Sequence, residues 1–168
     1  MNEFLAKHLL LANKNLIITI HYGQSIDKSI FDIKLSKEHI NELIKNVAKN
    51  YKYKISHTNS IHKHKIDNTI ISRINNNIEY EIHNTIDTSS HGCLFLKVTE
   101  IQKDSLIPES TENYHSSETY DLMTITINNT VELHICDFSS YYTAHISIKK
   151  PVTCSILKDI LNKIFHTS

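Results

Sequence analysis

Histidine is the first residue type of this chain that suggests chemistry, because twelve histidines occur among its 168 residues. His62 and His64 have the i, i+2 spacing that places two side chains on one face of a strand. His57 approaches them if residues 58–61 form a turn. A zinc site needs three or four ligands, and Asp67 is the nearest carboxylate that completes such a set. We interpret these histidines as solvated side chains, and we keep a histidine-dependent metal-binding hydrolase using His57, His62 and His64 as the alternative.

A cysteine nucleophile with a histidine base is a second possible chemistry. Cys154 is expected near the start of the last helix, where the helix dipole favours an anion. His134 or His145, on neighbouring predicted strands, is then the candidate base. No surrounding motif resembles a cysteine hydrolase, so no catalytic residues are predicted.

Paired carboxylates occur at Glu79 and Glu81, which share one face of a predicted strand. An E-x-E pair on a strand resembles the start of the signature of tunnel-type triphosphatases. That signature continues with Lys or Arg two places on, where this chain has His83, and no further acidic strands follow in the expected alternation. The predicted hairpin also places Arg73 opposite Glu79, which gives the pair a structural explanation. The sequence is therefore not assigned to that family or to any other.

Lysines concentrate around segment 50–65, NYKYKISHTNSIHKHK, although the formal net charge of the chain is zero. A hairpin with a four-residue loop pairs lysine with lysine here, and like charges placed opposite each other are destabilising. A three-residue loop pairs Ile55 with Lys63 and leaves the apolar face without a partner. We therefore expect an unpaired basic surface that is either solvated or in contact with a polyanion such as RNA phosphate. The predicted polyanion-binding residues are Lys45, Lys49, Lys52, Tyr53, Lys54, Lys63 and Lys65.

Composition excludes some functions. The chain has two Gly and two Pro residues, whereas Walker loops and dinucleotide fingerprints need several glycines for a close approach to phosphate. Its three cysteines have no close spacing, which argues against a disulfide framework or a zinc ribbon. The apolar run over residues 9–12 is too short for a signal segment or a membrane span. We predict no cofactor and a reducing intracellular location, either cytoplasmic or nuclear.

The pattern of apolar residues predicts a short helix over 3–12, strands over 16–20 and 30–35, and a helix over 37–50 capped by Ser36. A hairpin with a three-residue loop at 75–77 is expected to pair Ile74 with Ile78. A second hairpin, with its loop at 128–130, is expected to pair Ile127 with Val131. A strand over 93–101, a long mobile loop over 102–119, a strand over 142–149 and a closing helix after Thr153 complete the chain.

This order predicts one α+β domain over residues 1–168, with a TBP-like or helix-grip arrangement. We expect a mostly antiparallel twisted sheet of about seven to nine strands with two main helices packed on one face. The predicted function is a non-enzymatic intracellular interaction module, an accessory factor or subunit of a larger protein or ribonucleoprotein assembly. Its expected contact is RNA phosphate, through the basic segment, and no membrane is involved.

Overall fold

The computed structural model describes residues 1–27, 30–103 and 116–167. Its helices are α1 (Asn2–His8), the short 3-10 helix η1 (Leu9–Leu11), α2 (Lys37–Asn50) and α3 (Cys154–Phe165). Its strands are β1 (Leu16–Tyr22), β2 (Gln24–Asp27), β3 (Ile30–Asp32), β4 (Tyr53–Ile66), β5 (Thr69–Ile74), β6 (Asn77–His91), β7 (Leu94–Lys103), β8 (Ser116–Ile127), β9 (Val131–Asp137) and β10 (Tyr142–Ile148).

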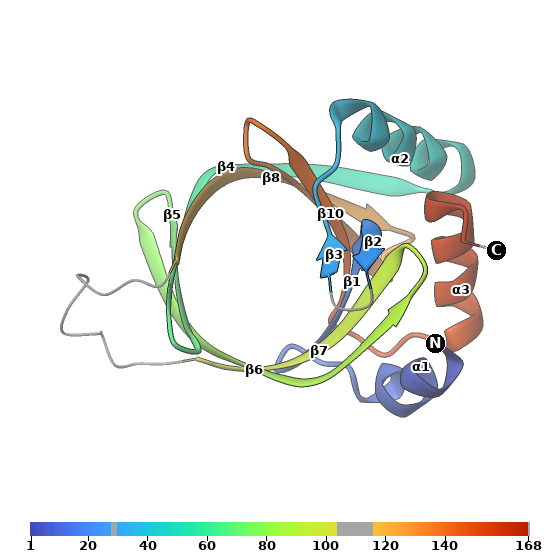
Figure 1. The fold of residues 1–168 in the computed structure, drawn as a ribbon, viewed down its shortest axis with the longest axis horizontal. Helices are drawn as coiled ribbons and strands as arrows, with labels where there is room; N and C mark the ends of the chain where they lie inside the picture. Colours follow the sequence, from blue (N-terminus) through green and yellow to red (C-terminus); the bar gives the residue numbers. More distant parts are fainter. Residues whose placement is uncertain (28–29, 104–115, 168) are drawn as a thin grey trace.

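Among the described residues, eight antiparallel strands close into a barrel in the order β1-β10-β9-β8-β4-β5-β6-β7. Figure 1 shows this barrel end on, with α1, α2 and α3 outside the ring along one side. Pairing of β1 with both β10 and β7 closes the ring. Strands β2 and β3 form a separate hairpin, whose Phe31 ring lies 5.9 Å from the Phe95 ring of β7. The short strand β5 pairs only with residues 62–66 of β4 and residues 77–82 of β6, so in the described residues the rest of these two strands pairs along one edge.

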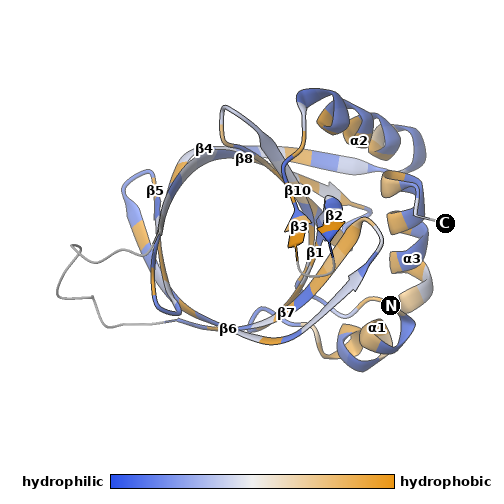
Figure 2. Cartoon of the chain, in the orientation of Figure 1, coloured by the Kyte–Doolittle hydropathy of each residue, from blue (hydrophilic) through white to orange (hydrophobic). Residues whose placement is uncertain are grey.

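The hydrophobic core lies between the helices and the outer face of the barrel. Ile20 of β1, Leu133 of β9 and Leu157 of α3 are all fully buried and belong to one cluster. Figure 2 shows that hydrophobic residues are frequent on the side of the barrel next to the helices. Because successive side chains of a strand point to opposite faces, the residues between these apolar positions point into the barrel.

Helix α2 begins at the predicted cap. The Ser36 side chain accepts a hydrogen bond from the His39 backbone N–H at 3.3 Å, and the Ser36 N–H donates to Nδ1 of His39 at 3.4 Å. Ile40, Leu43 and Val47 of its apolar stripe are buried in the core cluster. The apolar stripe therefore packs α2 against the outer face of the barrel.

The β8–β9 hairpin has the predicted register. Ile127 pairs with Val131 and Ile125 with Leu133, across the predicted loop at 128–130. Asn128 and Asn129 both have positive φ angles, 50° and 58°, a conformation that Asn tolerates better than most side chains. The prediction is confirmed.

The predicted register of the β5–β6 hairpin is wrong by one residue. Ile74 pairs with Asn77 across a two-residue turn, so Ser72 faces Glu79 and Arg73 faces Ile78. Arg73 is therefore not opposite Glu79, and the structural explanation for the carboxylate pair no longer holds. A slip of one residue moves every side chain to the other face.

Segment 50–65 forms no hairpin, because most of it belongs to the single long strand β4. One edge of β4 pairs with β8 and the other with β5. A bulge lies between Thr58 and Ile61, where Ser60 has a φ angle of 55°. Lys63 lies between Glu118 and Ser72 in the register. Distant strands thus supply neighbours that no pairing within the segment offered.

The α+β prediction with a many-stranded, antiparallel sheet is confirmed, but closure of the sheet into a barrel was not predicted. Residues 102–103 and 116–119 of the predicted mobile loop belong to β7 and β8, and residues 104–115 lie outside the described residues. Over the described part of the chain, no helix combines the length and the apolarity that crossing a membrane requires.

Candidate active site in the barrel interior

Three histidines form a row across neighbouring strands on the interior face of the barrel. Ile20 of β1 is buried in the outer core, so its neighbour His21 points inward. The register places His21 beside His145 of β10, and His145 beside His134 of β9. Thr124 of β8 continues the row. We call His21, His145 and His134 the histidine row.

The imidazoles of the histidine row lie close together. The ring centroids of His21 and His145 are 5.1 Å apart, and those of His134 and His145 are 4.9 Å apart. Burial lowers the pKa of His21 to about 4, with a further contribution from Lys97. Burial also lowers the pKa of His145 well below its usual value and lowers that of His134, although Glu132 acts in the opposite direction. Low pKa values keep the row neutral at about pH 7.

A second row, one step along the strands, carries charges of both signs. In order around the barrel its members are Lys54, Thr126, Glu132, Ser147, Thr19 and Lys97. One carboxylate oxygen of Glu132 lies 3.4 Å from Nζ of Lys149, and the other lies 3.7 Å from Nε2 of His134. Glu132 therefore links a lysine to the histidine row.

Two buried polar atoms of these rows have no hydrogen-bond partner among the described residues. They are Oγ1 of Thr19 and Nε2 of His134. Buried polar atoms are nearly always paired with protein, water or a ligand. The two atoms therefore mark places on the interior face where a polar partner is accommodated.

The opposite wall adds a further lysine and a carboxylate–imidazole pair. Nζ of Lys63 lies 5.5 Å from the centre of the Tyr120 ring. Burial by itself lowers the pKa of Lys63, but Tyr120, Cys136 and Glu118 together outweigh it and raise the pKa. On β6, Nε2 of His83 lies 3.3 Å from a Glu81 carboxylate oxygen.

Part of the interior face is apolar. Ile61, Tyr120 and Cys136 form a small buried cluster, against which Ile74, Leu122 and Phe138 pack. The polar groups of the histidine row, the charged row and the wall that carries Lys63 thus lie beside an apolar patch.

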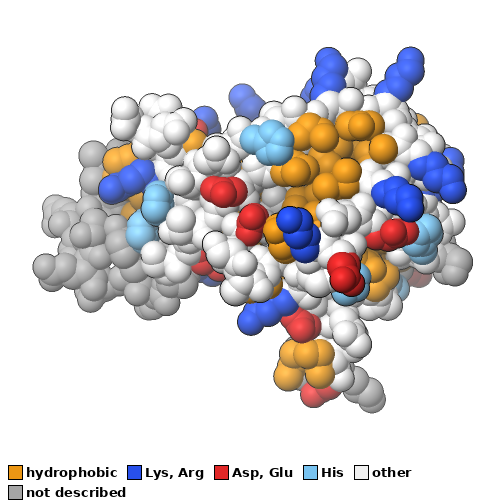
Figure 3. Space-filling view, turned by 90° about the horizontal axis from the view of Figure 1, so that it is seen from above, with side chains coloured by type: hydrophobic (Ala, Val, Ile, Leu, Met, Phe, Trp, Pro, Cys, Tyr) orange, Lys and Arg blue, Asp and Glu red, His pale blue; other side chains and the backbone are white. Residues whose placement is uncertain are grey.

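The seven residues predicted to bind a polyanion do not share one surface. Lys54, Lys63 and Lys65 lie on the interior face of β4, as their pairing shows. Lys45, Lys49, Lys52 and Tyr53 are exposed outside the barrel. In the face seen in Figure 3, Lys and Arg side chains are scattered among acidic and apolar ones. Polyanion binding by this set stays a prediction.

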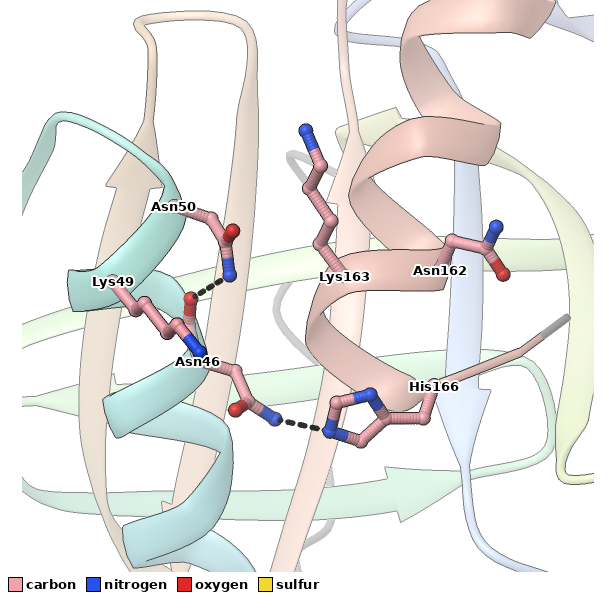
Figure 4. A pocket seen from close by; sticks show the side chains of 6 residues that line it. All are labelled: Asn46, Lys49, Asn50, Asn162, Lys163 and His166. Atoms are coloured by element: carbon pink, nitrogen blue, oxygen red, sulfur yellow. Dashed lines mark hydrogen bonds between the residues drawn. The ribbon is translucent and has the colours of Figure 1, made fainter.

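Lys49 lines a pocket of about 450 Å³ between the ends of α2 and α3 (Figure 4). The buried amide of Asn46 donates to the Ile164 carbonyl at 3.0 Å, and its nitrogen lies 3.1 Å from Nε2 of His166. Asn50 donates to the Asn46 carbonyl at 2.8 Å. These contacts satisfy carbonyls near the helix ends, so the pocket has a structural explanation.

The histidines of the metal alternative do not converge. His57, His62 and His64 lie on the outer face of β4, and Nδ1 of His62 lies 3.0 Å from Oγ1 of Thr119. Within residues 1–27, 30–103 and 116–167, no three His, Cys, Asp or Glu side chains are placed to hold a metal ion. Cys154 begins α3 outside the barrel, on the other side of the wall from the histidine row.

No known family model and no curated protein matches the sequence, but solved structures share its fold. The RNA triphosphatase domain of a trifunctional mimivirus mRNA capping enzyme has a TM-score of 0.68 at 13% identity, over 98% of this chain and 95% of that chain. A monoclinic structure of the mimivirus capping enzyme triphosphatase has a TM-score of 0.69 at 10% identity, with the same coverage. The S. pombe Pct1 RNA triphosphatase has a TM-score of 0.63 at 8% identity, over 94% of this chain and 79% of that chain.

These similarities correct the predicted function. The prediction of a non-enzymatic interaction module is wrong, because the structures that share the fold are RNA triphosphatases, which are enzymes. The alternative of a hydrolase is better supported, although not with the three histidines first considered for it.

Sequence reasoning missed the histidine row. His134 and His145 were considered only as bases for Cys154, and His21 was not considered. A signal was present, because Thr19 and His21 alternate with the isoleucines of β1 in the way that Glu132 and His134 alternate with the apolar residues of β9. Only closure of the sheet shows that these polar faces meet inside a barrel.

Proposed function

We propose that this chain is a phosphohydrolase that removes the terminal phosphate of a triphosphate, with the 5′ end of RNA as its substrate class. The observation that carries the proposal is a closed barrel with charged rows on its interior face, in a fold that RNA triphosphatases share. The proposed site is the interior face.

Lysines of the interior are the proposed phosphate-binding groups. Lys97 lies close enough to His21, and Lys63 close enough to His134 and His145, to lower the pKa values of these histidines. Both lysines therefore act electrostatically on the same part of the interior. Preorganised positive charge of this kind stabilises the charge that spreads over the phosphate oxygens during phosphoryl transfer.

Glu132 is the proposed group that accepts the proton of the attacking water, and His134 is the proposed group that orients its carboxylate. Their functional atoms lie 3.7 Å apart. Water attacks the terminal phosphorus, and the bond from that phosphorus to the bridging oxygen breaks. The electron pair leaves on the diphosphate end, and the proton of the water passes to the Glu132 carboxylate.

A divalent metal commonly assists phosphoryl transfer. Because the described residues offer no cluster of three suitable ligands, no step of this proposal passes through a metal held by the protein. An S. pombe Pct1 structure contains the Spt5 CTD, so a protein partner in RNA processing is kept as part of the proposal.

Comparison of two lysine variants tests where the reaction occurs. Phosphate release from RNA with a labelled terminal phosphate is measured for wild type, Lys97→Met and Lys37→Met, with Mg²⁺ or Mn²⁺ supplied. Lys97 lies on the interior face, whereas Lys37 is exposed on α2 and outside the predicted polyanion-binding set. Removing one preorganised charge is expected to lower kcat by about a hundredfold or more in Lys97→Met, and Lys37→Met is expected to match wild type. Equal losses in both variants contradict an interior site.

A further inference from the structure

The histidine row has an arrangement that its structural surroundings do not explain. Its three imidazoles come from β1, β10 and β9 and lie about 5 Å from one another in sequence around the barrel. Nε2 of His134 is buried and has no hydrogen-bond partner among the described residues. The nearest charged group is the Glu132 carboxylate, 3.7 Å from this nitrogen and too far for a good hydrogen bond. A polar ligand at shorter range would therefore stabilise the buried nitrogen.

The charged groups that act on the row come from several strands of the barrel. Lys97 of β7 acts on His21, while Lys63 of β4 and Lys149, next to the end of β10, act on His134 and His145. Glu132 is the carboxylate next to the row, and it is already paired with Lys149. Further titratable groups on this interior face are Lys54 and Lys65 of β4, Lys103 of β7, Glu118 and Tyr120 of β8, Cys136 of β9, and Glu79, Glu81 and His83 of β6. Positive charge therefore dominates near the row.

We propose that the histidine row makes phosphate binding proton-coupled: a polyphosphate anion enters the interior together with one or more protons, which the imidazoles of the row take up. This inference deepens the proposed function and rests on it. The event is a binding equilibrium in which the anion and the protons associate with the protein and no covalent bond of the anion is broken. The ligand class is a chain of two or more linked phosphates, as in pyrophosphate or the triphosphate end of a nucleotide.

The physical reason is that a bound anion reverses the sign of the electrostatic potential at the imidazoles of the row. Without an anion, burial, the lysines and the neighbouring imidazoles all disfavour protonation of the row. An opposite charge within about 4–6 Å raises the pKa of a cationic group by about one to three units. A phosphate chain that bears several negative charges thus brings the row into the range where it binds protons at about neutral pH. The protonated imidazoles then donate to phosphate oxygens, including from Nε2 of His134.

Calorimetry of the full chain tests the inference. Adenosine 5′-(β,γ-imido)triphosphate, a probe whose terminal bridge resists cleavage, is titrated into the protein at about pH 7 in buffers that differ in ionisation enthalpy. The slope of the observed enthalpy against the buffer enthalpy gives the number of protons taken up. Wild type is compared with His145→Asn, at the centre of the row, and with His57→Asn, an exposed residue outside the barrel.

We expect wild type and His57→Asn to take up about one proton or more per bound probe, with affinity falling about tenfold for each unit rise in pH per coupled proton. His145→Asn is expected to lose at least half of this uptake. If His145→Asn does not fold, the wild-type slope and its pH dependence decide. Binding without uptake, or equal uptake in a folded His145→Asn, overturns the role of the row and leaves the hydrolase proposal standing. Absence of binding overturns the row as a phosphate site, and hydrolysis of triphosphate RNA then decides the proposed function separately.

Discussion

Replacement of His21 by Gln is expected to change how the stability of the protein depends on pH. The pKa of His21 falls from 6.5 to about 4 in the folded chain, first because of burial and then because of Lys97. A group with a lowered folded-state pKa binds fewer protons folded than unfolded. The contribution of His21 to the free energy of unfolding is therefore complete above the pKa of the unfolded state. It is lost as the pH falls towards the pKa of the folded state.

The size of the effect follows from these two pKa values. Between about pH 7.5 and about pH 5, linkage predicts that His21 removes roughly 2 kcal/mol from the free energy of unfolding of wild type. His21→Gln lacks this proton-binding site. It should therefore lose roughly 2 kcal/mol less than wild type over the same interval, whatever its absolute stability.

Urea unfolding at the two pH values measures this difference directly. His57→Gln is the matched control, because His57 is exposed on the outer face of β4, and it should show the wild-type dependence. If wild type and His21→Gln lose equal free energy between the two pH values, His21 is not held neutral in the barrel, and the account of the interior is refuted.

Two further predictions concern the fold that positions the interior. Leu133→Ala removes a fully buried side chain from the outer core. It should lower the free energy of unfolding, measured by urea titration, by about 2–5 kcal/mol. A change below about 0.5 kcal/mol contradicts the placement of the core outside the barrel. Gly23→Ala adds a Cβ that overlaps the carbonyl of Asp32. Near-UV circular dichroism and proteolysis should therefore report displacement of the β2–β3 hairpin, and wild-type behaviour in both measurements shows that β3 does not approach Gly23.

Local features of the fold were predictable from the sequence because short-range chemistry sets them. Ser36 caps α2 as expected, and the apolar alternation around 128–130 fixes the register of β8 and β9. The register of the β5–β6 hairpin was predicted wrongly, because both faces of that hairpin mix apolar and polar residues and so do not fix the register. There, Asn77 begins β6 rather than completing a three-residue loop.

The periodicity of apolar residues did not predict that the sheet closes into a barrel. Closure depends on β1 pairing with both β7 and β10, and contacts this distant in sequence leave no local pattern. The same limit hid the site, because the polar alternates of strands such as β1 look like a solvent-facing surface until the strands form a ring. His21 and Lys97 become neighbours only through that closure.

The basic segment illustrates the change that the structure makes. As an isolated stretch it has lysines with no acceptable partner, which suggested an exposed surface. Within β4, Lys63 points into the barrel, where Tyr120 and Glu118 lie near it. Alternation along one strand thus divides the lysines between the interior and the outer surface.

The most direct measurement is the fate of the terminal phosphate of RNA. The purified chain is incubated, in the presence of Mg²⁺ or Mn²⁺, with RNAs that carry a 5′ triphosphate, diphosphate or monophosphate. Released phosphate and the remaining 5′ ends are then quantified. We expect one phosphate released per triphosphate end, a diphosphate end as product, and no release from the monophosphate. Absence of release from the triphosphate, or release at equal rates from all three, contradicts the proposed function.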